Sequence, residues 1–129
     1  MNISKPDISP TKSELEILKV LWKQGPSTVR SVNKILNNDT RDVKYTSTLK
    51  LMQIMVEKGL ITRNTDSMTH VFTARHEEQI MKADLVDKFV SNLFEGSATK
   101  LMMQLMGNQK TSQDELKAIR KLLDELDKA

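Results

Sequence analysis

Cysteine is absent from this chain of 129 residues, which excludes disulfides, thiolate metal sites and cysteine nucleophiles. Aromatic residues are scarce as well, at 4% of the chain. The core must therefore be built from Leu, Ile, Val and the eight Met residues, whose flexible side chains fill irregular gaps. Because such a core is small, we expect any helical region appended to it to need a partner surface.

Long apolar runs are missing too. Residues 1–14 contain no apolar stretch of signal-peptide length. No uninterrupted run approaches the roughly 20 apolar residues that a helix needs to span a bilayer. The sequence therefore predicts a cytoplasmic protein without membrane insertion.

Charge is divided unevenly between the two halves of the chain. Residues 1–75 hold 12 Lys and Arg against 7 Asp and Glu, whereas residues 76–129 hold 8 against 10. A basic front half is typical of a surface that meets a polyanion such as nucleic acid. The same asymmetry can also arise by chance on solvated faces, so charge alone leaves both interpretations open.

Two helices are predicted near the start of the chain. Thr11 and Glu14 form a T-x-x-E capping box, in which each side chain satisfies a free backbone N–H at a helix start. The Gly-Pro pair at 25–26 ends this first helix. Either residue of Ser27-Thr28 can cap the second, which we expect the polar residues 37–39 to break.

A third helix and a hairpin follow. Helical spacing of apolar residues predicts a helix over residues 45–58, with Gly59 just beyond it as a helix C-terminus prefers. The period then changes, and residues 60–63 and 70–73 are predicted as two strands around the turn residues 64–67. Three helices followed by a hairpin are typical of a winged helix-turn-helix.

From residue 76 onward the sequence predicts only amphipathic helices. A long one ends near Gly96, a short one ends at Gly107, and a last one begins at a second capping box formed by Ser112 and Glu115. Such short helices are marginal alone, so we expect them to pair with a second copy, although folding back onto the front domain is an alternative. The predicted dimerisation residues are Leu93, Phe94, Leu101, Leu105, Leu116, Ile119, Leu123 and Leu126.

The predicted fold is therefore mostly α with a small β-hairpin wing. It comprises a winged-helix DNA-binding domain over residues 1–75 and a C-terminal helical dimerisation region over residues 76–129. Two-fold symmetry would place two winged helices on a palindromic operator.

Residues for base contacts lie on the outward face of the predicted helix 45–58, since the second helix of a helix-turn-helix enters the major groove. Gln53 can pair bidentately with adenine, and Lys50 can donate to guanine or phosphate. Ile54 is unusual on such a face, where it could touch a thymine methyl or pack inward. Lys58 is a further predicted phosphate contact. The predicted DNA-binding residues are Thr28, Arg41, Lys44, Tyr45, Thr46, Ser47, Lys50, Gln53, Ile54, Arg63 and His70.

Two other functions stay open, while an enzyme is not expected. A winged helix can act as a protein–protein interaction module, but a docking face should be more apolar than this one. The second open function is a regulator that responds to a small ligand, in which the Met-rich segment 101–106 would line the ligand-binding site. His70 and His76 have no histidine partner at helical spacing and there is no Gly-rich phosphate loop, so no catalytic site, metal or cofactor is predicted.

Two blocks of the sequence resemble the penicillinase-repressor family of the BlaI/MecI type. The stretch ISPTKSELEILKVLWKQGPSTVRSVNKIL is similar to the family's opening at Glu14, Leu21-Trp22, Gly25-Pro26 and Thr28-Val29. The stretch YTSTLKLMQIMVEKGLITR is similar to its recognition helix at Tyr45-Thr46, Thr48 and Lys58-Gly59-Leu60. A helical tail follows at the expected place, so the resemblance covers essentially the whole chain.

The resemblance implies a homodimeric, sequence-specific transcriptional repressor on a palindromic operator, in control of a β-lactam-response operon. In this family a membrane sensor with a zinc-protease domain detects a β-lactam, and the repressor is cleaved in its tail at an Asn-Phe pair. The matching segment here is residues 103–106, which makes Gln104–Leu105 the candidate bond, and cleavage with altered specificity or no cleavage both stay open. The copper-responsive relatives bind metal through a C-terminal cysteine cluster, which this chain lacks.

The wing departs from the family. A Gly-Arg pair is common there, whereas the tip of this hairpin has residues 66–68, Asp-Ser-Met. Arg63 and His70 are left as the candidate DNA contacts of the wing.

Overall fold

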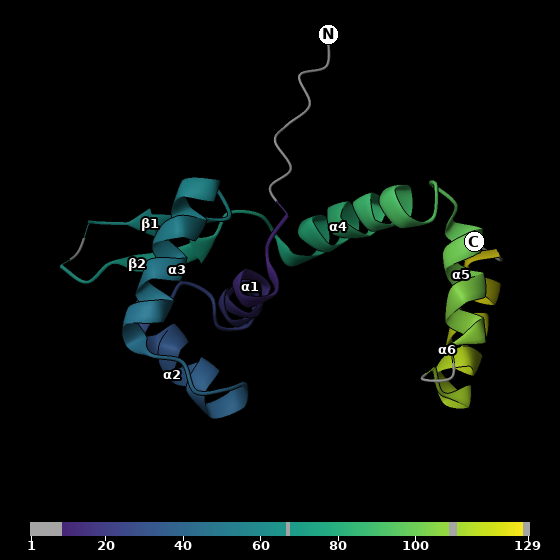
Figure 1. Ribbon diagram of the computed structural model, residues 1–129, viewed down its shortest axis with the longest axis horizontal. Coiled ribbons are helices and arrows are strands. Elements are labelled where there is room, and N and C mark those ends of the chain that lie inside the picture. Colours follow the sequence, from purple (N-terminus) through teal and green to yellow (C-terminus); the bar gives the residue numbers. More distant parts are fainter. Residues whose placement is uncertain (1–8, 67, 109–110, 128–129) are drawn as a thin grey trace, which may run out of the picture. The chain divides into compact units, whose positions relative to one another are not determined.

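The computed structural model describes residues 9–66, 68–108 and 111–127, with the side chains of residues 126 and 127 excepted. Its elements are α1 (Lys12–Gln24), α2 (Val29–Asp39), α3 (Tyr45–Lys58), β1 (Ile61–Asn64), β2 (Val71–Ala74), α4 (Glu78–Leu93), α5 (Ala98–Gly107) and α6 (Gln113–Asp127) (Figure 1). This order confirms a mostly helical fold with a two-stranded hairpin after the third helix. Within the described residues, no helix is both long and apolar enough to cross a membrane.

The chain divides into two compact units, which we call the N-terminal unit, up to Ala83, and the C-terminal unit, from Asp84. Helix α4 begins in the first and continues into the second. Among the described residues, the twelve buried apolar side chains all belong to the N-terminal unit, which therefore holds the core: Ile17, Leu18, Leu21, Val29, Val32, Leu36, Met52, Met55, Leu60, Ile61, Phe72 and Met81.

The predicted capping box at the start of α1 is present. The Glu14 N–H donates to Thr11 Oγ1 at 3.2 Å, and the Thr11 N–H donates to Glu14 Oε1 at 2.8 Å. At the other end Gly25 has a φ of 82°, a conformation that side chains with a Cβ rarely adopt. Its N–H donates to the Leu21 carbonyl at 2.8 Å, so α1 ends where the Gly-Pro pair predicted.

Side-chain amides fix the turn between α2 and α3. Asn37 Oδ1 accepts from the Val43 N–H at 2.6 Å, and Asn37 Nδ2 donates to the Val43 carbonyl at 3.1 Å. Asn33 Nδ2 donates to the same carbonyl at 2.9 Å and to Thr48 Oγ1, a buried atom of α3, at 2.8 Å. The expectation that residues 37–39 break α2 is wrong, because the helix runs to Asp39 and Asn37 bonds to the turn instead of interrupting the helix.

The hairpin after α3 pairs β1 with β2 in antiparallel register, from Ile61 opposite Ala74 to Asn64 opposite Val71. Both strands begin one residue later than predicted. Gly59, in the left-handed region at φ 80°, lets the Leu60 N–H donate to the Met55 carbonyl at 2.9 Å, so Leu60 belongs to the end of α3.

The start of α2 is attached to the hairpin. The Ser27 N–H donates to the Phe72 carbonyl at 3.0 Å, and the Phe72 N–H donates back to the Ser27 carbonyl at 2.8 Å. Of the two predicted caps it is Thr28 that caps α2, since its Oγ1 accepts from the Ser31 N–H at 3.1 Å. The first turn of α2 therefore lies beside the wing.

An ion pair connects the first turn of α1 to the last turn of α3. Lys58 Nζ donates to Glu14 Oε1 at 2.6 Å, and the Glu14 side chain is only 2% exposed. Burial on its own would raise the pKa of Glu14. The hydrogen bonds from Lys58 and Thr11, with the charge of Lys58, outweigh burial and hold that pKa below its usual value. Lys58, predicted as a phosphate contact, forms this pair, and its contact with phosphate stays a prediction.

The ion pair makes the stability of the fold dependent on pH. Because its pKa is lowered on folding, Glu14 stabilises the protein fully above its unfolded value near 4.5, and this stabilisation is lost as the pH falls through the folded value. We expect Glu14→Gln to lower the free energy of unfolding at pH 7 by about 1.5–3 kcal/mol, and to flatten its decline below about pH 4.5. Urea unfolding followed by circular dichroism across this pH range measures both effects.

The matched control is Glu57→Gln, which removes an exposed carboxylate of α3 and should leave the acid profile unchanged. A Glu14→Gln variant that loses stability with acid as steeply as the native protein would contradict this role.

Candidate nucleic-acid interface

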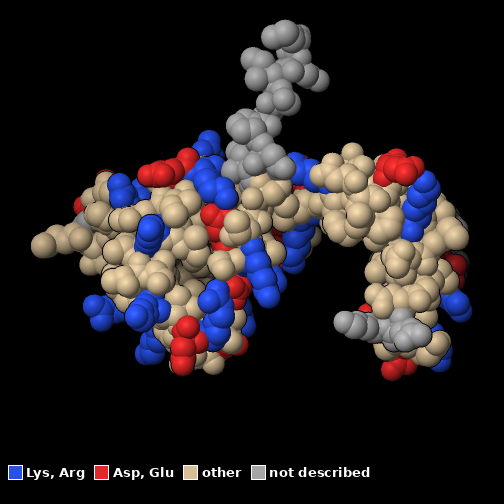
Figure 2. Space-filling model, in the orientation of Figure 1, with Lys and Arg blue, Asp and Glu red and all other residues tan. Residues whose placement is uncertain are grey.

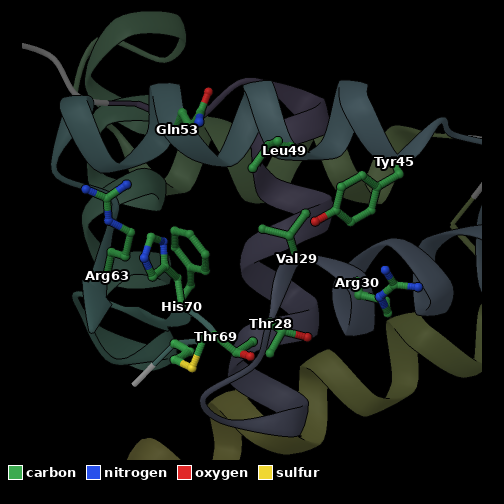
Figure 3. Close-up of a pocket in the computed structure, with 11 residues that line it drawn as sticks. Thr28, Val29, Arg30, Tyr45, Leu49, Gln53, Arg63, Thr69 and His70 are labelled. Atoms are coloured by element: carbon green, nitrogen blue, oxygen red, sulfur yellow. The ribbon is translucent and has the colours of Figure 1, made fainter. Parts of the chain in front are cut away.

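A groove of about 610 Å³ lies between the start of α2, the outer face of α3 and the wing (Figure 3). Figure 3 shows Gln53, Leu49 and Tyr45 spaced along α3, with Arg63 and His70 on the wing. The lining residues are Thr28, Val29, Arg30, Tyr45, Leu49, Gln53, Arg63, Met68, Thr69, His70 and Phe72.

Three separate elements bring predicted DNA-binding residues together in this groove. Thr28 comes from the cap of α2, Tyr45 and Gln53 come from α3, and Arg63 and His70 come from the wing. The bridge between Ser27 and Phe72 positions the first of these elements against the third. Because these residues are far apart in the sequence, their convergence depends on the tertiary fold.

The groove has an apolar floor and a polar rim. Val29 and Phe72 are buried, whereas Arg63, His70 and Gln53 are exposed. The lining residues include two arginines and a histidine and no carboxylate. This composition suits a polyanion whose sugars and base methyl groups are apolar and whose phosphates are charged.

The outer face of α3 is mostly polar, with Tyr45 and Ile54 as its exposed large apolar side chains. Thr46, Ser47 and Lys50 are exposed but lie outside the groove, on the part of the helix that it does not enclose. Thr48, whose hydroxyl accepts from Asn33, and Met52 are buried on the opposite face. The expected division of α3 into a buried and an exposed face is therefore confirmed.

Ile54 lies between the two faces of α3, with 38% of its surface exposed. This exposure leaves it accessible from solvent, so it does not pack fully inward. A contact of Ile54 with a thymine methyl stays a prediction.

Carboxylates on α1 neutralise some of the cations of the N-terminal unit. Arg41 Nη2 lies 3.1 Å from Glu16 Oε1 and 3.2 Å from Ser13 Oγ, which attaches the residues after α2 to α1. Lys58 is paired with Glu14. Among the described residues, four cations on or beside the groove have no ion-pair partner: Arg30, Lys44, Lys50 and Arg63.

The N-terminal unit has an excess of basic side chains on its surface. Figure 2 shows more Lys and Arg than Asp and Glu on the visible face of the N-terminal unit. Phosphate contacts of Lys and Arg supply sequence-independent affinity for DNA, because each releases condensed counterions. Arg41, which already has a partner, stays a predicted phosphate contact.

Arg30 is a groove residue that the sequence interpretation missed. It lies in the first turn of α2, where the helix dipole disfavours a cation, and that turn has no acidic residue. A cation at the start of a predicted helix could have indicated this residue from the sequence, because its charge does not stabilise the helix.

Metal chemistry has no support in the part of the chain that the structure describes. No group of three or more His, Cys, Asp or Glu side chains is placed there to hold a metal ion.

Comparison with known proteins matches residues 10–125 to the family described as Penicillinase repressor. The chain belongs to this family. It is a transcriptional repressor of the BlaI/MecI type, and the family is not one of enzymes.

Three relatives show how far the similarity extends. The chain is 22% identical over 120 residues to the penicillinase repressor of Bacillus licheniformis, covering 93% of this chain and 91% of the relative. It is 26% identical over 116 residues to the transcriptional regulator BlaI of Mycobacterium tuberculosis, covering 88% and 82%. It is 20% identical over 114 residues to the methicillin resistance regulatory protein MecI of Mammaliicoccus sciuri, covering 88% and 92%. The similarity is thus distant but extends over nearly the full length of each protein.

We expect substitutions on the exposed face of α3 to weaken the binding of DNA by this repressor. Gln53→Ala and Lys50→Ala should each weaken binding to the repressor's own upstream DNA by about 1–3 kcal/mol, if each removes a bidentate base contact. Fluorescence anisotropy with a labelled duplex gives the dissociation constants. Competition with single-base variants of that duplex shows whether sequence preference is relaxed.

Lys19→Ala is the matched control, because Lys19 is an exposed cation of α1 and does not line the groove. Unchanged affinity together with unchanged sequence preference in both α3 variants would exclude this face as the base-reading surface.

Proposed function

We propose that this repressor is a homodimer that binds a palindromic operator, with α3 in the major groove and the wing along the adjacent backbone. Residues 1–75 supply DNA binding and residues 76–129 supply dimerisation in this proposal. The observation that carries the DNA-binding part is the groove beside α3, whose rim has two arginines and a histidine and whose lining has no carboxylate. Use of the same surface as a protein-docking site has less support, because exposed side chains of α3 such as Thr46, Ser47 and Lys50 are polar.

Dimerisation is supported by the surface of the C-terminal unit. Among its described residues no apolar side chain is fully buried. Leu93 is 62% exposed and Leu123 is 49% exposed, each on the apolar side of an amphipathic helix. Burying a leucine is worth about 1.5–3 kcal/mol, so a second copy that offers the same stripe would gain several such contacts.

The remaining predicted dimerisation residues whose side chains are described are less exposed than Leu93 and Leu123. Phe94 and Phe89 form an edge-to-face pair with ring centroids 5.7 Å apart, which leaves Phe94 half-buried within the unit. The side chain of Leu126 lies outside the described residues. Those that are half-buried are Phe94, Leu101, Leu105, Leu116 and Ile119.

A single substitution tests the dimer and the operator together. Leu123→Asp should give monomers in sedimentation velocity, because a carboxylate cannot be buried in the apolar interface. The native protein should give a discrete, salt-sensitive gel-shift complex with its own upstream DNA that resists non-specific competitor. The variant should lose this complex on a palindrome and bind a half-site no better than before.

Lys121→Asp is the control, since it adds negative charge to the same helix at an exposed polar position. A Leu123→Asp protein that remains dimeric would overturn the assignment of the interface. A folded native dimer that forms no discrete DNA complex would overturn operator binding.

We further propose that the repressor controls a β-lactam-response operon and that a membrane sensor protease cleaves its tail at Gln104–Leu105. The names of its relatives, a penicillinase repressor and a methicillin resistance regulatory protein, support the operon. Helix α5 supports the site, because Gln104 is exposed and no residue of this helix is fully buried. Little burial therefore opposes the local unwinding that a protease needs.

Exposure of the source cells to a β-lactam should produce a fragment that ends at Gln104 while the operon is induced. Mass spectrometry of the repressor recovered from induced and uninduced cells detects it. Induction with only the intact chain present would rule out cleavage as the signal.

A further inference from the structure

Arg30 and Tyr45 form a contact between the two helices of the helix-turn-helix. The guanidinium carbon of Arg30 lies 5.9 Å from the centroid of the Tyr45 ring, within the range of a cation–π interaction. Arg30 is in the first turn of α2, and Tyr45 is the first residue of α3. Both line the groove, and the Tyr45 side chain is 44% exposed (Figure 3).

The position of Arg30 does not favour the stability of its own helix. A cation in the first turn opposes the helix dipole, and α2 has no acidic residue there to offset it. Within the described residues no carboxylate forms an ion pair with Arg30, unlike Arg41 and Lys58. The protein thus leaves this charge available at the edge of the groove.

The chemistry of the contact leaves Arg30 able to bind an anion. A guanidinium over the face of a ring uses none of its five N–H donors in a hydrogen bond. Those donors match the paired oxygens of a phosphate and can bind it bidentately. In a helix-turn-helix, the first helix of the pair crosses the DNA backbone while the second reads bases. A residue on α2 is therefore placed for a phosphate and not for a base edge.

We propose that Arg30 contacts a backbone phosphate of bound DNA and that Tyr45 is the positioning residue that holds it toward the groove. This inference rests on the DNA-binding function proposed above and adds a contact that couples α2 to the start of the recognition helix.

Salt dependence tests the phosphate contact. Binding of Arg30→Ala, Arg30→Lys and the native protein is measured between low and moderate salt, on the repressor's own upstream duplex and on a scrambled duplex of equal length. Because each protomer of the proposed dimer carries one Arg30, Arg30→Ala should reduce the magnitude of the slope of log K against log salt by about 0.9 per protomer, or about 1.8 for the bound dimer, on both duplexes, and weaken binding about ten-fold per lost contact. Arg30→Lys should keep the slope because it keeps the charge, with a smaller loss of affinity.

Lys19→Ala serves as the control for removal of a cation outside the groove, and its slope should stay at the native value. An unchanged slope for Arg30→Ala on both duplexes would overturn the phosphate contact. If the native protein does not prefer its upstream duplex, sequence-specific repression is contradicted. The phosphate contact is still tested in that case, because the slopes of the native and variant proteins are compared on each duplex separately.

The role of Tyr45 is tested by a double-mutant cycle with Arg30→Ala and Tyr45→Leu. If the ring positions the guanidinium, Arg30→Ala should cost less in the Tyr45→Leu protein than in the native protein, and Tyr45→Phe should behave as native. Fully additive effects would overturn the positioning role. A purely structural role for Arg30 would lower the melting temperature without altering the salt slope, and would also overturn the proposal.

Discussion

The amide groups of Asn33 and Asn37 fix the turn on which the geometry of the N-terminal unit depends. Their bonds to the backbone of Val43 and to the buried hydroxyl of Thr48 determine where α3 begins and which of its faces turns inward. Buried polar groups are usually paired, and the bond from Asn33 satisfies the Thr48 hydroxyl where it faces the core. The exposed polar row of α3 is the consequence on the opposite side of the helix.

Acidic residues of α1 determine which cations remain available to a partner. Glu14 and Glu16 neutralise Lys58 and Arg41, and in doing so attach α1 to the end of α3 and to the turn after α2. The buried pair contributes to the fold, whereas an exposed pair such as that of Arg41 contributes little stability. The cations around the groove have no such partner in the described chain. The cations that are paired with carboxylates thus connect helices of the N-terminal unit, whereas the unpaired cations lie around the groove beside α3.

The two units bury apolar surface to very different extents. The N-terminal unit contains all twelve buried apolar side chains of the described residues, and the backbone hydrogen bonds between Ser27 and Phe72 attach the start of α2 to the wing. The C-terminal unit exposes leucines along amphipathic helices. The N-terminal unit thus has a core of its own, whereas the described helices of the C-terminal unit leave apolar side chains exposed. This contrast agrees with the separate roles proposed for the two parts.

Sequence patterns alone predicted the order of helices and hairpin, the caps at Thr11 and Gly59, and the exposed polar residues of α3, because these follow from local spacing and local backbone preference. It misplaced the end of α2 and the start of the first strand, since the bonds of Asn37 to Val43 and of Leu60 to Met55 are local contacts that apolar spacing does not record. It also missed Arg30, and it did not predict that Lys58 pairs with Glu14. Only the tertiary structure decided which cations face the groove, because an ion pair such as Lys58 with Glu14 joins residues far apart in the chain, and no local pattern records which carboxylate a lysine will meet.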